Sequence, residues 1–109
     1  MKYMFLIYGS PDNVQTPEVM QQWFAFDAEA RAYAGYNGGE ALHPVQAATT
    51  VRTSAGQAIV TDGPFAETKE VLGGYYLMDC PDLDEALVWA RKLNAIDGST
   101  LEVRPIVVF

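Results

Sequence analysis

The apolar positions of this chain form two kinds of pattern, unbroken runs and helical stripes. The run over residues 2–8 shows no polar alternation, which predicts a central strand covered on both faces. Apolar side chains at spacings of three and four predict two helices, over 17–34 and 83–97. Thr16 and Asp82 stand at the N-cap positions of these helices. The two apolar stripes consist of Val19, Trp23, Phe26, Ala30 and Tyr33, and of Leu83, Ala86, Leu87, Ala90 and Leu93.

Strands are predicted between the two helices. Residues 40–46 predict a strand that is broken or bent at Pro44, because proline cannot donate to a sheet ladder. Residues 49–53 and 57–61 predict a β-hairpin, and Gly56 in its turn suits a left-handed conformation.

The remaining segments complete an alternation of strands and helices. Glycines within 35–39 predict the end of the first helix, and 75–78 predicts a second buried strand. Residues 101–109 predict a last strand that is edge-like around its proline. The order β-α-β, hairpin, β-α-β predicts a ferredoxin-like α+β sandwich with an antiparallel sheet and both helices on one face. We expect one domain over residues 1–109.

Such a sheet has a second face that the helices do not cover. The strands at 2–8 and 75–78 are nevertheless apolar on both sides. An exposed apolar face of this kind predicts a partner. In a chain this short the expected cover is a second copy, so we expect a homodimer with its sheets packed face to face.

Composition excludes several classes of function. Half of the 109 residues are hydrophobic and 19% are charged, which is typical of a globular protein. Seven basic residues are scattered among fourteen acidic ones, so no basic stripe is available for nucleic acid. No apolar run approaches the roughly eighteen residues of a membrane span. The apolar N-terminal run lacks a small-residue cleavage site, and Cys80 has no second cysteine to pair with, so we expect a cytoplasmic protein.

The segment 61–70, Thr-Asp-Gly-Pro-Phe-Ala-Glu-Thr-Lys-Glu, has the most unusual local chemistry. Pro64 has a fixed φ and restricts the residue before it, a restriction that Gly63 tolerates, so the chain should turn sharply at Asp62. The Asp62 carboxylate then either accepts backbone N–H bonds as a structural turn residue or points into a cleft. Residues 64–70 are expected to hold a turn of helix.

The first helix carries two further features. Asp27 and Arg31, four residues apart, are expected to pair on its exposed side. Trp23 and Phe26 are interpreted as core residues, with the lining of a ligand pocket as the alternative.

The loop and its surroundings carry a family resemblance. Asp-Gly-Pro-Phe-Ala-Glu-Thr-Lys-Glu at 62–70, Gly-Gly-Tyr-Tyr at 73–76 and Asp-Leu-Asp-Glu-Ala at 82–86 resemble the YCII-related family, and more narrowly its branch named after the Asp-Gly-Pro-Phe motif. The resemblance covers nearly the whole chain. It implies a dimeric α+β barrel and a small-molecule site with a histidine and an aspartate in a cleft. Members of this branch occur alone or near extracytoplasmic-function sigma factors.

The family's histidine has no counterpart in the predicted first helix, so its His–Asp pair cannot be transferred intact. Asp62 is the motif residue that remains, and His43 is the only imidazole in the chain. In an enzyme or ligand-binding site, Asp62 would act as general base or substrate anchor and His43 as a second acid–base group. Lys69 would contact an anion. The candidate ligand-binding positions are Gly63, Pro64, Phe65, Lys69 and Gly74.

A second interpretation stays open, that of a regulatory or protein-interaction module without chemistry, associated with sigma-factor signalling. The loop is then a structural turn, His43 a polar residue at a strand end, and Lys69 a solvated partner of neighbouring glutamates. Cys80 is interpreted as a small buried apolar residue rather than a nucleophile. No paired histidines or cysteines and no phosphate-binding loop of known pattern occur, so no metal or cofactor site is predicted.

Overall fold

A computed structural model describes all residues from 1 to 109, and it confirms the ferredoxin-like α+β fold. The main sheet is antiparallel with the strand order β2-β5-β1-β6, and β3 and β4 form a separate two-stranded sheet. The elements are β1 (Lys2–Gly9), α1 (Pro17–Ala32), β2 (Tyr36–Ala41), a 3-10 turn (Val45–Ala47), β3 (Thr49–Ser54), β4 (Gln57–Asp62), β5 (Val71–Asp79), α2 (Leu83–Asp97) and β6 (Thr100–Pro105).

Both helices begin at the predicted caps. The Thr16 hydroxyl accepts a hydrogen bond from the Val19 amide at 3.2 Å, and the Asp82 carboxylate accepts one from the Glu85 amide at 2.9 Å. α2 ends at Gly98 in the left-handed conformation, with φ of 77°. Neither helix is long and apolar enough to cross a membrane.

β2 differs from the prediction in its position. We expected a strand over 40–46, but the strand ends at Ala41, and the glycines expected to end α1 lie largely within it. A Cβ at Gly39 would lie 2.5 Å from the Tyr76 ring. Glycine therefore serves here to let an aromatic side chain of the neighbouring strand pack against the β2 backbone, which sequence periodicity does not indicate.

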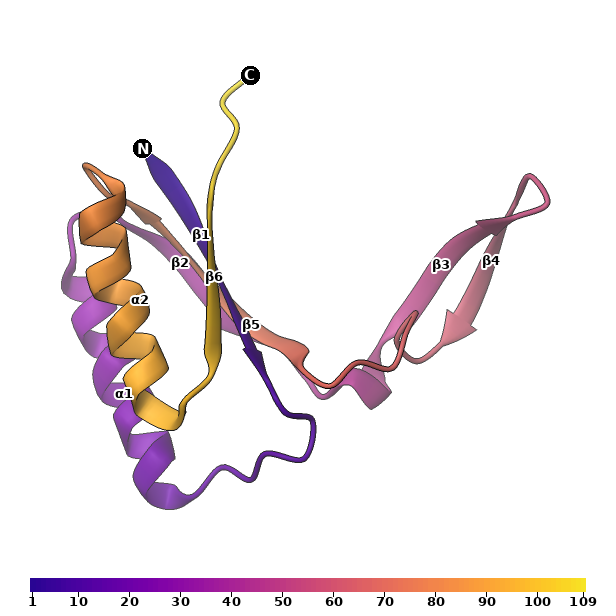
Figure 1. Cartoon of the computed structure of the whole chain (residues 1–109), viewed down its shortest axis with the longest axis horizontal. Coiled ribbons are helices and arrows are strands. Elements are labelled where there is room, and N and C mark those ends of the chain that lie inside the picture. The colour runs from indigo at the N-terminus through magenta and orange to yellow at the C-terminus, as the bar shows by residue number, and fades with distance from the viewer.

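The core lies between the main sheet and the two helices, which cover the same face of the sheet (Figure 1). Phe5, Met78 and Leu93 are fully buried there. The Phe26 ring makes an edge-to-face contact with the Trp89 ring, with 5.7 Å between the ring centroids. These contacts tie α1 and α2 to each other and to the sheet.

The apolar stripe of α2 differs from the prediction at its first turn. Leu83, expected in the core, is 50% exposed because it is the first residue of the helix, where the chain has only just left the sheet. Trp89, which was not included in the stripe, is buried between Ala86 and Leu93. Cys80 is buried as expected, and burial raises the pKa of its thiol.

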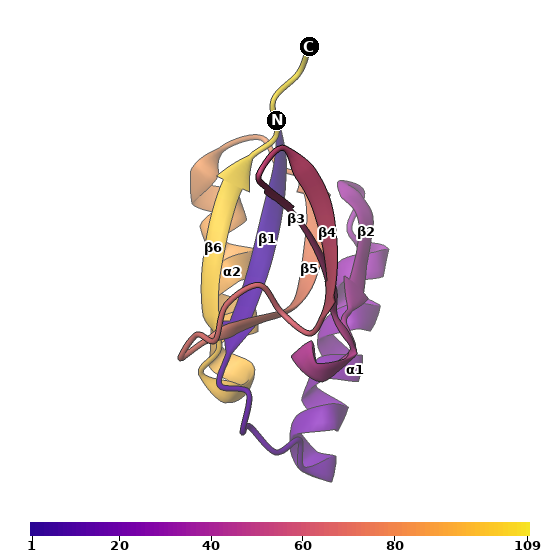
Figure 2. The same ribbon diagram turned by 90° about the vertical axis from the view of Figure 1, so that its right-hand side faces the viewer.

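The β3-β4 hairpin projects from the sheet on the side opposite the helices, and we call residues 49–62 the arm (Figures 1 and 2). Its turn has the left-handed pair expected of a tight hairpin, with Ala55 at φ 50° and Gly56 at φ 78°. Val51 and Val60 lie opposite each other in the ladder and are 64% and 66% exposed. The arm therefore presents an apolar pair to solvent.

The chain from the arm to β5 contains bends but no helix, so the helical turn expected over 64–70 was wrong. This segment begins with Gly63 and Pro64, and residues 64–70 are all exposed. No side chain of the segment therefore packs into the core to stabilise a helical turn.

The sheet face opposite the helices stays uncovered within the chain. β1 is central, as predicted, and its odd-numbered side chains are buried against the helices. Side chains alternate along a strand, so the even-numbered ones point to the other face. There they join two half-buried apolar side chains of β5, and we call the set the outer face. It consists of Met4, Leu6, Tyr8, Tyr75 and Leu77.

Candidate functional site

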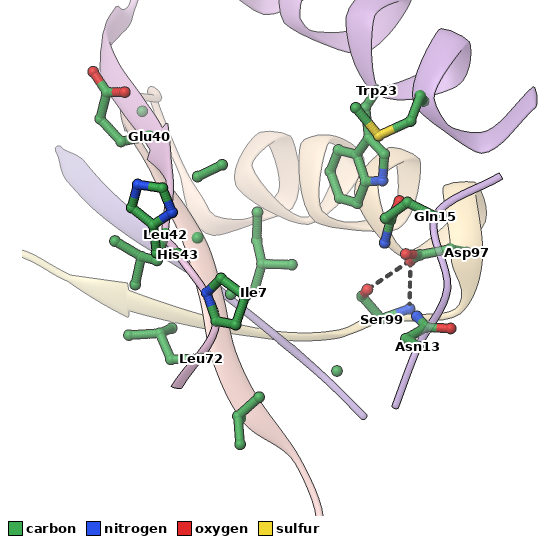
Figure 3. Close-up of a pocket in the computed structure, with 18 of the residues that line it drawn as sticks. Ile7, Asn13, Gln15, Trp23, Glu40, Leu42, His43, Leu72, Asp97 and Ser99 are labelled. Atoms are coloured by element: carbon green, nitrogen blue, oxygen red, sulfur yellow. Dashed lines mark hydrogen bonds between the residues drawn. The ribbon is translucent and has the colours of Figure 1, made fainter. Parts of the chain in front are cut away.

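A pocket of about 520 Å³ lies at the end of the sheet where β1 ends and β5 begins (Figure 3). One face of α1 and the loop after β1 form one side of it. Segment 39–46 and residues 71–74 of β5 form the other. Figure 3 shows the Trp23 indole on the α1 side and Leu42, His43 and Leu72 on the opposite side.

Two of the predicted site residues line this pocket. His43 follows β2 and is exposed, and Gly74 is buried in β5. A Cβ at Gly74 would lie 2.9 Å from the Glu40 carbonyl oxygen, so glycine at this position lets β2 and β5 approach each other. His43, the only histidine of the chain, thus lies beside β2 and β5, the two strands that Gly74 allows to approach each other.

The other predicted residues lie outside the pocket lining, at the base of the arm and in the loop that follows it. Asp62 is exposed at the end of β4, and Phe65 is 73% exposed. Gly63 donates its amide to the Ala48 carbonyl at 2.7 Å and adopts φ of 93° before Pro64. The sharp turn expected at this point is therefore present. Lys69 is also exposed.

The pocket contains a hydrogen-bonded group that sequence reasoning recognised only in part. Asp27 accepts a hydrogen bond from Arg31 Nε at 2.7 Å and another from the Tyr76 hydroxyl at 2.7 Å. The hydrogen bond from Arg31 lowers the pKa of Asp27, which is therefore ionised at neutral pH. Burial, reinforced by the hydrogen bond to Asp27, raises the pKa of Tyr76, so its phenol stays protonated.

The Asp27–Arg31 pair follows from its spacing, but its membership in a pocket does not. The available signal was the spacing of four residues that places Trp23, Asp27 and Arg31 along one side of α1. Trp23, one turn before Asp27, packs against the core as interpreted from sequence, and it also lines the pocket, which was the alternative. Tyr76 lies 49 positions from Asp27, so only the folded sheet brings them together.

These groups have different chemical capacities. Asp27 is already engaged by two donors, which makes it a poor free base. His43 carries the only imidazole of the chain, which can donate and accept hydrogen bonds. At the opposite end of the pocket, Asp97 Oδ1 accepts hydrogen bonds from the Ser99 amide and hydroxyl (Figure 3). No group of three or more histidine, cysteine, aspartate or glutamate side chains gathers closely enough to hold a metal ion.

Comparison with known proteins identifies the family. A model of the YCII-related domain matches residues 1–109. An uncharacterised protein of Rhizobium meliloti (strain 1021) is 57% identical over 70 residues, which cover 62% of this chain and 56% of that protein. The match thus spans little more than half the length of the relative. Because the family model covers the entire chain, the protein belongs to the YCII-related family.

Proposed function

We propose that this chain binds a small molecule in the pocket beside the base of the arm, and that His43 acts there as an acid–base group. The observation that carries the proposal is the pocket itself. It is concave, of a size that suits a small metabolite, and its lining mixes apolar side chains with polar ones, among them the only imidazole of the chain. His43 would accept a proton from the ligand or donate one to it.

Asp62 takes part in this proposal as general base or anchor, with the Gly63, Pro64, Phe65 and Lys69 loop as a ligand contact. It does not line the pocket of its own chain. The 3-10 turn at 45–47 connects the pocket wall to the arm. Gly63, the neighbour of Asp62, is hydrogen-bonded to Ala48, directly after this turn. For both residues to act on one ligand, the ligand would have to be long enough to reach Asp62 and His43, or Asp62 would have to come from a second copy.

We further propose a homodimer in which the outer faces of two copies pack together. Five half-buried apolar side chains on an open sheet face support it, with Leu6 at its centre. The arm gives independent support, because an isolated two-stranded hairpin is marginally stable in water. Contact with a second copy would cover Val51 and Val60.

Finer assignments follow from the motif. We assign the chain to the Asp-Gly-Pro-Phe branch of its family because residues 62–65 have that order at a sharp turn. A cytoplasmic protein agrees with the single cysteine, and a bacterial one agrees with the relative in Rhizobium meliloti.

A thermal-shift screen of small metabolites tests the pocket. A compound that binds the folded chain raises the melting temperature by several degrees when it is well above its Kd. We expect His43→Ala to reduce that rise, and Gln57→Ala, at the exposed tip of the arm, to leave it unchanged. Stabilisation that His43→Ala does not affect would place the ligand elsewhere, and a library without a stabilising compound would count against the pocket.

Acid–base chemistry needs a separate readout. Compounds that stabilise the protein would be incubated with it and followed by mass spectrometry. His43→Gln keeps a polar side chain but removes the imidazole, so it should abolish turnover and retain binding. Asp62→Asn should likewise abolish turnover while the fold is kept. Turnover retained in either variant removes that residue from the mechanism.

The exposed arm supports a second candidate, a regulatory or protein-interaction module without chemistry, linked to sigma-factor signalling. Val51 and Val60 offer an apolar surface of the kind that protein partners bind. A pulldown that returns one stoichiometric partner, and loses it in a Val51→Thr, Val60→Thr double variant, would favour this candidate. Stabilisation by a metabolite with no such partner would favour the pocket.

A further inference from the structure

We propose that the pocket selects ligands with a carboxylate group, and that Arg31 is the residue that holds this group. The inference rests on the proposed function, since it names the chemical class of the ligand of that pocket. The net charge of the chain is −7, so attraction of an anion has to come from a local cation rather than from the protein as a whole.

Arg31 is the one lysine or arginine that lines the pocket. Its guanidinium is fixed at two points. Nε donates to Asp27 Oδ2 at 2.7 Å, and Cζ lies 5.5 Å from the centroid of the Tyr36 ring. A guanidinium has five N–H donors, and the bond to Asp27 uses one of them. The two terminal NH₂ groups form no ion pair within the chain and present the planar fork that matches a carboxylate.

The Arg31 side chain is 60% exposed, and the position of Asp27 is what distinguishes this arrangement from other surface pairs. An exposed pair of residues four apart on a helix contributes only about 0.3–0.5 kcal/mol and is loosely held. Here the second oxygen of Asp27 accepts the hydroxyl of Tyr76, whose ring is buried in the core. A carboxylate fixed from the core orients the guanidinium before any ligand arrives, which lowers the entropy lost on binding.

The same face of α1 indicates the rest of the ligand. Met20, Trp23 and Phe24 form an apolar half of the pocket wall, and Asp27 and Arg31 follow at the next turns. The helix rises 1.5 Å per residue, and the Arg31 side chain reaches back to Asp27, so its charge lies about 6–12 Å from the indole along the helix axis. A carboxylate attached to an apolar or aromatic body of that length would fit.

The other carboxylates of the pocket are directed elsewhere. Glu40 is opposite Tyr75 in the ladder, so its side chain points to the outer face, away from Trp23 (Figure 3). Asp97 is occupied by Ser99 at the far end. Asp27 is then the one pocket carboxylate beside the anion, and it neutralises the charge of Arg31, so the attraction comes from the free N–H donors of the guanidinium rather than from a net positive charge.

Three probes with the same aromatic body and different charge test this inference: 3-phenylpropanoate, its isosteric neutral amide 3-phenylpropanamide, and cationic 3-phenylpropylamine. Binding to the full chain would be followed by ¹⁵N NMR through the two tryptophan indole signals. Trp23 lines the pocket, and buried Trp89 serves as the internal reference. We expect the propanoate to shift the Trp23 signal and to bind about tenfold or more tightly than the amide, as a charged hydrogen bond would give.

Variants separate Arg31 from general charge effects. Arg31→Gln should weaken propanoate binding about tenfold or more without changing amide binding, and Arg31→Lys should give an intermediate loss because it keeps the charge but not the fork. Arg91→Gln is the matched control, since Arg91 is an exposed arginine of α2 outside the pocket. Urea unfolding would check that each variant is folded.

Several results would overturn the inference. These are equal binding of propanoate and amide, propanoate binding that Arg31→Gln leaves intact, and no binding of any probe. The proposed function can hold where this inference fails. A neutral metabolite whose stabilising effect depends on His43 would contradict the ligand class and leave the pocket as a binding site.

Discussion

Tyr76 shows how one side chain joins the core to the pocket. Its ring packs edge to face on Phe26 with 5.2 Å between centroids, and its hydroxyl reaches Asp27. The spacing of Asp27 and Arg31 predicts their pair, because residues four apart share a helix face. Nothing in the sequence indicates the third member, since a tyrosine in an apolar strand reads as core, and only the packing of α1 on β5 directs its hydroxyl to the helix.

We expect a pH effect from this group. The folded pKa of Asp27 is below its ordinary value of 3.8, so the ionised carboxylate stabilises the fold above that pH. The contribution is lost as the pH falls below about 4, through the folded pKa. In Asp27→Asn the acid-induced fall in unfolding free energy should be smaller, as measured by urea unfolding at a series of pH values. Asp12→Asn, at an exposed loop position, is the control, and equal profiles for the two variants would refute the expectation.

At the scale of elements, the helices were the most predictable part. Caps at Thr16 and Asp82 and apolar stripes are local signals, and they gave the correct starts. β2 was misplaced because its glycines serve contacts with a strand more than thirty residues away. The loop 63–70 was misjudged for a related reason, since the helical turn assumed there has nothing to pack against.

The two adjacent glycines of β5 should respond differently to substitution. Gly74→Ala would place a Cβ 2.9 Å from a β2 carbonyl oxygen, so we expect a loss of about 1–3 kcal/mol as the strands separate. Gly73→Ala should change the unfolding free energy little, because the nearest atom to its Cβ would lie at 3.8 Å. Urea unfolding of the two variants measures the difference. Similar costs at both positions would contradict the geometry.

At the scale of the whole molecule, the uncovered sheet face could be anticipated from sequence. Strands apolar on both sides require cover on both sides, and two helices supply only one layer. The direction of the arm could not be predicted, because a hairpin with few buried contacts carries no signal for where it points.

Light scattering coupled to size-exclusion chromatography tests the homodimer. We expect twice the 12.0 kDa mass of one chain. Leu6→Glu places a charge in the middle of the outer face and should give a monomer. Val88→Glu should leave the dimer intact, because Val88 is an exposed residue of α2, on the other side of the sheet. A wild-type monomer, or a dimer that tolerates Leu6→Glu, would rule out this interface.

The arm also makes one copy unusually extended. The radius of gyration is 15.8 Å, compared with about 13 Å for a compact domain of this length. A free copy therefore offers a protease a projecting segment with Arg52 exposed on it, and dilute protein should be cut there by trypsin faster than concentrated protein. If assembly shelters the arm, proteases degrade the unpaired copies first. The exposed arm then makes the lifetime of the protein depend on the protein's concentration.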